Sequence, residues 1–154
     1  MSLLAGCVHN VTQSLDARAV PIVVKERMPI NVALLVIDED LKQSQVPSFT
    51  HSGGHTRRFQ ANPLKNLKDT LLLTLPQVFQ RVTLVRAVPA GGGYAAVLVP
   101  KVTDMRWGSS WDFDGIGYKF TIAATLQVLD NKGTTLLAAT SERESAGKAS
   151  GTSS

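Results

Sequence analysis

The sequence predicts an α+β domain in which an antiparallel-rich mixed sheet of about five strands carries one main helix on one face. One stretch has apolar residues at helical spacing. A short continuous apolar run comes before it, and segments of alternating or β-branched residues come after it. The chain has 154 residues, a length that suits one domain with one hydrophobic core.

The first predicted strand is residues 30–37, with the sequence INVALLVI. A near-continuous apolar run of this kind is typical of a central strand that is buried on both faces. The next stretch, residues 41–60, is polar and contains Pro47, Gly53 and Gly54. We expect this stretch to be a long loop.

The helix is predicted to begin at Asn62-Pro63, because asparagine caps a helix N-terminus and proline suits its first turn. Apolar residues then recur at spacings of three and four over residues 64–79, and Leu71 in the middle of this face is expected to be buried. Pro76 lacks a backbone N–H, so the regular helix should end just before it. A separate short turn is expected up to Arg81.

Four further strands are predicted as a meander in the second half of the chain. They are expected at residues 82–88, 94–106, 116–128 and 134–141. The third of these has the clearest alternation of apolar and polar residues, which indicates one face toward water. Residues 130–133, Asp-Asn-Lys-Gly, supply a hairpin turn between the last two strands.

The remaining segments define the expected organisation of the chain. Residues 1–20 are expected to hold a truncated signal remnant, a lipidation site and a polar tether, and residues 21–141 to form one α+β domain. Residues 142–154 have no apolar spacing and are expected to be a disordered tail.

The motif Leu4-Ala5-Gly6-Cys7 resembles the lipobox of bacterial lipoproteins. In that motif small residues before the cysteine fit a dedicated peptidase, and the thiol accepts a diacylglyceryl group. Cys7 is the only cysteine, so an internal disulfide is excluded and lipidation is its expected role. The alternative is a chance match, because only six residues precede Cys7 and a signal needs a longer apolar stretch.

With this motif, the order of strand, helix and meander resembles small outer-membrane lipoproteins that accompany envelope machines. The YajG-type lipoproteins are the nearest comparison, and the lipopolysaccharide-assembly and transport-auxiliary lipoproteins are more distant ones. The resemblance includes the segments LKDTLLLTLPQVFQRVTLV and GIGYKFTIAATLQVLDNKG. It implies a lipid-anchored accessory on the periplasmic face of a Gram-negative outer membrane, without an active site.

The expected role of this accessory is to bind another envelope protein in assembly or transport, through an exposed sheet edge or an aromatic loop. Trp107, Trp111 and Phe113 gather around the flexible sequence Gly108-Ser109-Ser110 and are the predicted partner-binding residues. A few aromatic residues often dominate the energy of an interface. The alternative is that both tryptophan rings only cover the end of the sheet.

An anionic lipid or glycan is the alternative ligand. Residues 57–106 contain eight Lys or Arg against two acidic residues, an excess that attracts anions. The predicted anion-binding residues are Arg57, Arg58, Lys65 and Lys68.

We expect no enzyme, cofactor, metal site or nucleic-acid partner. His51 and His55 stand four apart, but Gly53-Gly54 between them argues against the shared helix face that a metal pair needs. Residues 112–115, Asp-Phe-Asp-Gly, lack the full calcium-loop pattern, and residues 91–93 are a glycine turn without a phosphate-binding lysine after it. No nucleic-acid recognition motif accompanies the pI of 9.5.

Overall fold

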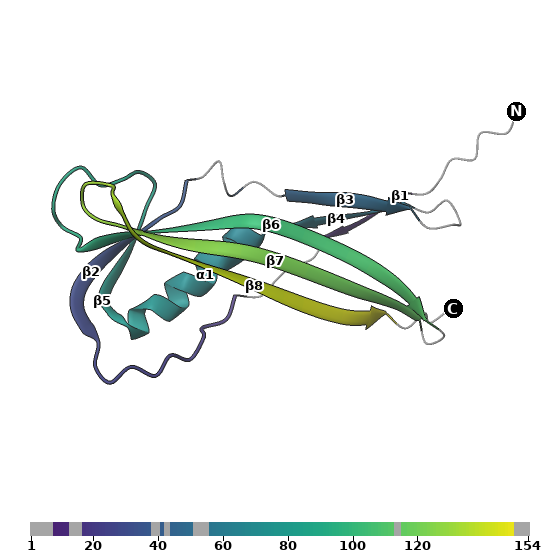
Figure 1. The fold of residues 1–154 in the computed structure, drawn as a ribbon, viewed down its shortest axis with the longest axis horizontal. Helices are drawn as coiled ribbons and strands as arrows, with labels where there is room; N and C mark the ends of the chain where they lie inside the picture. Colours follow the sequence, from purple (N-terminus) through teal and green to yellow (C-terminus); the bar gives the residue numbers. More distant parts are fainter. Residues whose placement is uncertain are drawn as a thin grey trace, which may run out of the picture.

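The computed structural model describes residues 8–12, 17–37, 41, 44–50, 56–112 and 115–149 (Figure 1). The strands among these residues form a three-stranded sheet in the order β1-β4-β3 and a five-stranded sheet in the order β5-β2-β6-β7-β8. One helix packs on the larger sheet, so the predicted α+β class is confirmed. The elements are β1 (Val8–Thr12), β2 (Met28–Leu35), β3 (Ser44–Thr50), β4 (Thr56–Ala61), α1 (Pro63–Thr74), η2 (Leu75–Gln77), β5 (Phe79–Val85), β6 (Ala96–Asp112), β7 (Gly115–Leu129) and β8 (Thr135–Ala149).

Strand β2 is the buried centre of the larger sheet. It pairs in parallel with β5 on one side and with β6 on the other. Its residues Val32, Ala33 and Leu34 are at most 1% exposed. Successive side chains of a strand point to opposite faces, so both faces of β2 must be covered. The predicted double-sided burial of this apolar run is confirmed.

Two apolar clusters lie on the two faces of β2. The cluster on the helix face joins Val32 and Leu34 to Leu64 of α1 and Leu98 of β6. The other cluster joins Ala33 and Leu35 to Val97, with Tyr94 and several aliphatic residues packed around them. The core therefore depends on one strand that contributes side chains in both directions.

Helix α1 begins as predicted. The side chain of Asn62 accepts a hydrogen bond from the backbone N–H of Lys65 at 2.9 Å, and a proline occupies the first turn. The helix ends at Thr74 and a 3-10 turn follows. The expected separate turn is therefore present, but it ends at Gln77 and not at Arg81, because β5 already begins at Phe79. Leu71 is half-buried against the core cluster rather than fully buried.

The predicted long loop at residues 41–60 is also wrong in part. It contains β3 and β4, which pair with each other in antiparallel fashion. Strand β1, where a tether was expected, pairs in parallel with β4. These strands are rich in polar residues and lack regular apolar alternation. They are therefore recognised as strands by their pairing and not by a pattern in their own sequence.

The predicted meander of four strands is wrong in part, because β5 pairs in parallel with β2 and only β6, β7 and β8 form a meander. These three strands are longer than predicted. Strand β6 pairs with β2 only through Ala96–Leu98 and then continues beside β7 to Asp112. At about 3.3 Å per residue, β7 is roughly 50 Å long. Strand β8 continues to Ala149, so residues 142–149, expected to be disordered, are paired with β7. In Figure 1 these three strands extend well beyond the end of β2.

The turn between β7 and β8 forms at the predicted residues. One side-chain oxygen of Asp130 accepts the backbone N–H of Lys132 at 2.8 Å and that of Thr134 at 2.7 Å. Gly133 has a φ of +82°, a conformation in which a residue with a side chain would be strained. The carboxylate and the glycine together fix the chain reversal that aligns β8 with β7.

The Asp130 turn should make stability depend on pH. Hydrogen bonds from the backbone N–H groups of Thr134 and Lys132 hold the pKa of Asp130 below its ordinary value of 3.8. The turn therefore stabilises the fold above pH 3.8 and loses this contribution as the pH falls below 3.8 through the folded-state pKa. The stability difference between the parent protein and Asp130→Asn should shrink over that window in denaturant melts. A difference that stays constant would contradict this assignment.

Leu34 should be the most sensitive core position. Its side chain is fully buried, so Leu34→Ala removes apolar contacts and leaves a cavity. We expect a loss of about 2–5 kcal/mol in the free energy of unfolding, measured by denaturant titration. The control Leu137→Ala changes a leucine that is 60% exposed and should cost no more than about 0.5 kcal/mol. Similar losses in both variants would contradict the central burial of β2.

Candidate functional site

The predicted lipidation site lies at the edge of what the structure describes. Cys7 itself is outside the described residues, as are Phe113 and the two histidines at positions 51 and 55. Strand β1 begins at Val8, the residue after Cys7, and is hydrogen-bonded to β4. A group attached to Cys7 is thus one residue away from a paired strand.

Trp107 and Trp111 lie in a strand rather than in the predicted loop. Both belong to β6, whose backbone pairs Trp107 with Phe120 and Trp111 with Ile116. The sequence Gly108-Ser109-Ser110 between them has the composition of a loop, but it is paired with β7 throughout. The prediction that these residues form a flexible loop is therefore wrong. That they bind a partner stays a prediction.

The register also shows what surrounds position 107 along the hairpin. Met105 stands opposite Ile122, one step before the Trp107 and Phe120 pair. Met105, Phe120 and Ile122 are half-buried. Positions two apart on a strand share a face, so Met105, Phe120 and Ile122 form a row of apolar residues along β6 and β7.

The predicted anion-binding residues are only partly brought together. Lys65 and Lys68 both lie on α1 and pair with Asp69, at 2.7 Å and 3.1 Å. The hydrogen bond from Lys65, with a further one from Lys68, holds the pKa of Asp69 below its ordinary value. Arg57 and Arg58 are neighbours on β4. The two lysines therefore already form ion pairs with one carboxylate of the protein, that of Asp69.

Strand β8 forms an open edge of the larger sheet. The sequence led us to expect an exposed edge but did not indicate which strand forms it. In the described part of the chain β8 pairs with β7 alone. Its residues from Thr135 to Glu144 are all exposed, and Leu136 and Leu137 keep 63% and 60% of their surface in water. The edge residues 135–139, TLLAA, carry no charge. An uncharged edge of this length is a template for a further strand.

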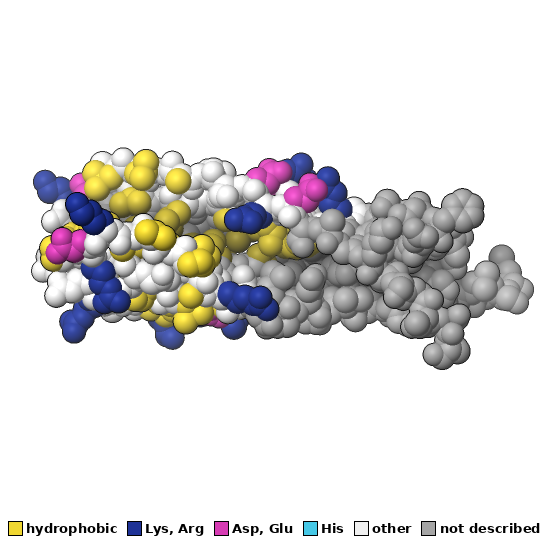
Figure 2. Space-filling view, turned by 90° about the horizontal axis from the view of Figure 1, so that it is seen from below, with side chains coloured by type: hydrophobic (Ala, Val, Ile, Leu, Met, Phe, Trp, Pro, Cys, Tyr) yellow, Lys and Arg dark blue, Asp and Glu magenta, His cyan; other side chains and the backbone are white. Residues whose placement is uncertain are grey.

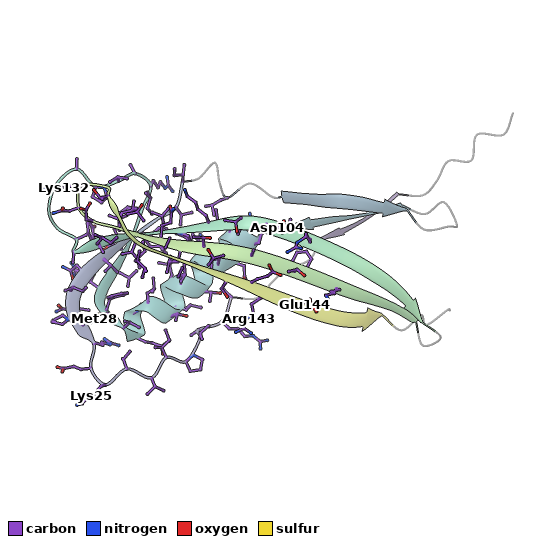
Figure 3. All side chains as sticks on the ribbon, viewed as in Figure 1. Lys25, Met28, Asp104, Lys132, Arg143 and Glu144 are labelled. Atoms are coloured by element: carbon purple, nitrogen blue, oxygen red, sulfur yellow. The ribbon has the colours of Figure 1, made fainter. Side chains whose placement is uncertain are left out.

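The distal half of β8 is different because ion pairs connect it to β7 and, across β7, to β6. Arg106 on β6 pairs with Asp104 at 2.6 Å and with Glu142 on β8 at 3.3 Å. Lys119 on β7 pairs with Glu144 at 2.7 Å. Figure 3 labels Asp104 and Glu144 on this extension of the sheet. Charged residues on an edge discourage strand addition, so the uncharged half is the favoured stretch.

Among the residues that the structure describes, no three or more His, Cys, Asp or Glu side chains gather as a metal site would require. None of the described helices is long and apolar enough to span a bilayer.

Comparison with known proteins identifies a similar fold. The sequence matches no protein-family model, and no curated protein matches it. The structure is similar to the crystal structure of protein XCC0632 from Xanthomonas campestris, of the family DUF330, with a TM-score of 0.55 and 11% sequence identity. The match covers 96% of this chain and 82% of that chain. At this identity the likeness shows that the two proteins share a fold.

Proposed function

We propose that this protein is a lipid-anchored accessory of the bacterial envelope that binds another envelope protein along the open edge of β8. The edge of β8 is the observation that carries the proposal, because among the described residues it leaves a row of backbone N–H and C=O groups without a strand partner on one side. An extended segment of the partner would add to the sheet as a further strand. Main-chain hydrogen bonds then supply affinity.

The composition of β8 indicates where the added strand would lie. Residues 135–139 are uncharged and include the exposed Leu136 and Leu137. Glu142 and Glu144, farther along, are engaged with Arg106 and Lys119. The best partner is therefore an extended apolar segment that pairs with residues 135–139.

The envelope location rests on the lipobox resemblance at Leu4-Ala5-Gly6-Cys7 and on the resemblance to outer-membrane lipoproteins. Because β1 begins at Val8, lipid on Cys7 would hold the folded domain close to the membrane. Several acyl chains would make this anchoring stable. The expected place is the periplasmic face of the outer membrane.

A protein partner is better supported than an anionic lipid or glycan bound at Lys65 and Lys68. Asp69 lies within 2.7 Å and 3.1 Å of the two ammonium groups. An anionic ligand would have to displace this carboxylate or accept its repulsion. The charge excess that suggested an anion is thus reduced where the two lysines meet.

The lipid anchor predicts a covalent modification at a single residue. When the gene is expressed with its full signal in a Gram-negative host, Cys7 should carry lipid and the protein should fractionate with membranes. Cys7→Ser should remove the modification, because serine lacks the nucleophilic thiol. Metabolic labelling with a fatty acid and mass spectrometry of the N-terminal peptide measure this. An unmodified Cys7 in membrane-bound protein would refute the anchor.

The open edge predicts that one lysine abolishes partner binding without unfolding the protein. Leu137→Lys places a charge on the uncharged half of β8, where Leu137 is 60% exposed, so stability should change by no more than about 0.5 kcal/mol. A photo-crosslinker placed at Ala138 should give a discrete adduct that Leu137→Lys removes.

The matched control is Val88→Lys, at a residue 48% exposed outside the strands. This control should keep the Ala138 adduct. Loss of the adduct in Trp107→Ala/Trp111→Ala, together with its retention in Leu137→Lys, would move the partner site to the β6-β7 hairpin. Retention in all three variants would refute both sites.

A further inference from the structure

The segment 18–27, between β1 and β2, exposes apolar side chains in an unusual concentration. Residues 18–29 are all exposed. Val23 is fully exposed, and Val20, Ile22 and Val24 keep 52%, 38% and 37% of their surface in water. Scattered apolar residues are normal on a protein surface, but consecutive ones mark a site of contact.

Hydrogen bonds hold this segment against the end of α1. The backbone N–H of Val20 donates to the hydroxyl of Thr74 at 3.0 Å. The amide side chain of Gln77 donates to the carbonyl of Val20 at 3.1 Å and accepts the N–H of Ile22 at 3.3 Å. In Figure 1 the chain passes below α1 before it enters β2. These bonds hold the backbone at Val20 and Ile22, directly before the fully exposed Val23.

Basic residues stand at both ends of the apolar run. Arg18 precedes it and Lys25 and Arg27 follow it, against the single acidic residue Glu26. Among the described residues, no ion pair is found for any of the three cations. Figure 2 views the molecule from below and shows apolar side chains interspersed with Lys and Arg over the described part. The segment thus combines exposed apolar side chains with an excess of positive charge.

We propose that the 18–27 segment is a membrane contact that binds the surface of an anionic phospholipid bilayer. Apolar side chains enter the boundary between head groups and acyl chains, while Lys and Arg meet the lipid phosphates. A bilayer suits this surface better than a protein groove does, because Val23 is fully exposed and the cations flank the apolar run on both sides. Arg18 lies eleven residues after Cys7, so a lipid anchor there would keep the segment near a bilayer.

The closeness of the 18–27 segment to a bilayer depends on the proposed lipid anchor. The exposure and the charge of the segment do not depend on it. The test therefore uses the full chain with Cys7→Ser, which carries no lipid. If this chain does not bind vesicles, the proposed membrane contact is refuted. Lipidation is then still tested separately, by labelling of Cys7. A failure of lipidation would likewise leave the vesicle result standing.

The experiment is sedimentation with vesicles of phosphatidylcholine alone or with about one third phosphatidylglycerol. The Cys7→Ser chain should bind the anionic vesicles, bind the neutral ones at least about tenfold more weakly, and lose binding as salt is raised. Val23→Asp should weaken binding by about tenfold or more, because a carboxylate at the centre of the apolar run opposes both contacts. Lys25→Glu/Arg27→Glu should weaken it at least as much.

The matched controls make the same changes elsewhere on the surface. Val88→Asp alters another exposed valine. Lys132→Glu reverses a charge that Figure 3 labels at the top of the view, whereas Lys25 lies at the bottom. Both controls should bind within about twofold of the parent. The proposal is overturned if the parent binds no anionic vesicles, if it binds neutral vesicles equally well, or if the controls lose as much binding as the segment variants.

Discussion

The structure depends on the burial of β2 on both of its faces. A strand with Val32 and Leu34 toward one side and Ala33 and Leu35 toward the other needs two separate covers. Helix α1 supplies the first cover. The second is built from Val97 of β6 and residues packed around it, among them Tyr94 in the connection after β5. Parallel pairing with β5 requires a crossover, and α1 lies within the chain that makes it.

The larger sheet has two parts, which differ in whether β2 lies beside the other strands. Around β2 the strands are held by apolar packing on both faces. Beyond Leu98, the last β6 residue paired with β2, the sheet continues as β6-β7-β8 without that strand. Backbone pairing and exposed cross-strand contacts extend it, such as the contact of 2.9 Å between the hydroxyls of Thr125 and Thr140. Apolar packing also continues into this extension, because Val102 and Leu126 pack against the cluster on the helix face and Ala123 is only 8% exposed.

The sequence predicted the parts of the fold in which periodicity and burial coincide. Local patterns in the chain indicated three of these parts: the apolar run of β2, the Asn62 cap of α1 and the alternation of β7. Strands β1, β3 and β4 and the end of β8 escaped prediction because their polar residues lack such patterns. Glu142 and Glu144 gave no local sign of a strand, since their partners Arg106 and Lys119 are distant in sequence.

The candidate site follows the same division. Trp107 and Trp111 stood out by residue type, but the glycine and serines between them suggested a loop, and only pairing with β7 reveals a strand. The β8 edge could not be read from composition because it is a property of strand order. The apolar residues after Arg18 were visible in the sequence, yet their exposure depends on how Thr74 and Gln77 hold the backbone.

The two proposed contacts have a joint consequence for how β8 would meet a partner. Lipid on Cys7 alone would fix one point of the domain and leave it free to rotate over the membrane. A second contact at residues 18–27 would act at high effective concentration, because the anchor already holds the segment near the bilayer. Even a weak second contact then restricts rotation. The edge of β8 would be presented in a nearly constant orientation, which reduces the orientational cost of adding a partner strand.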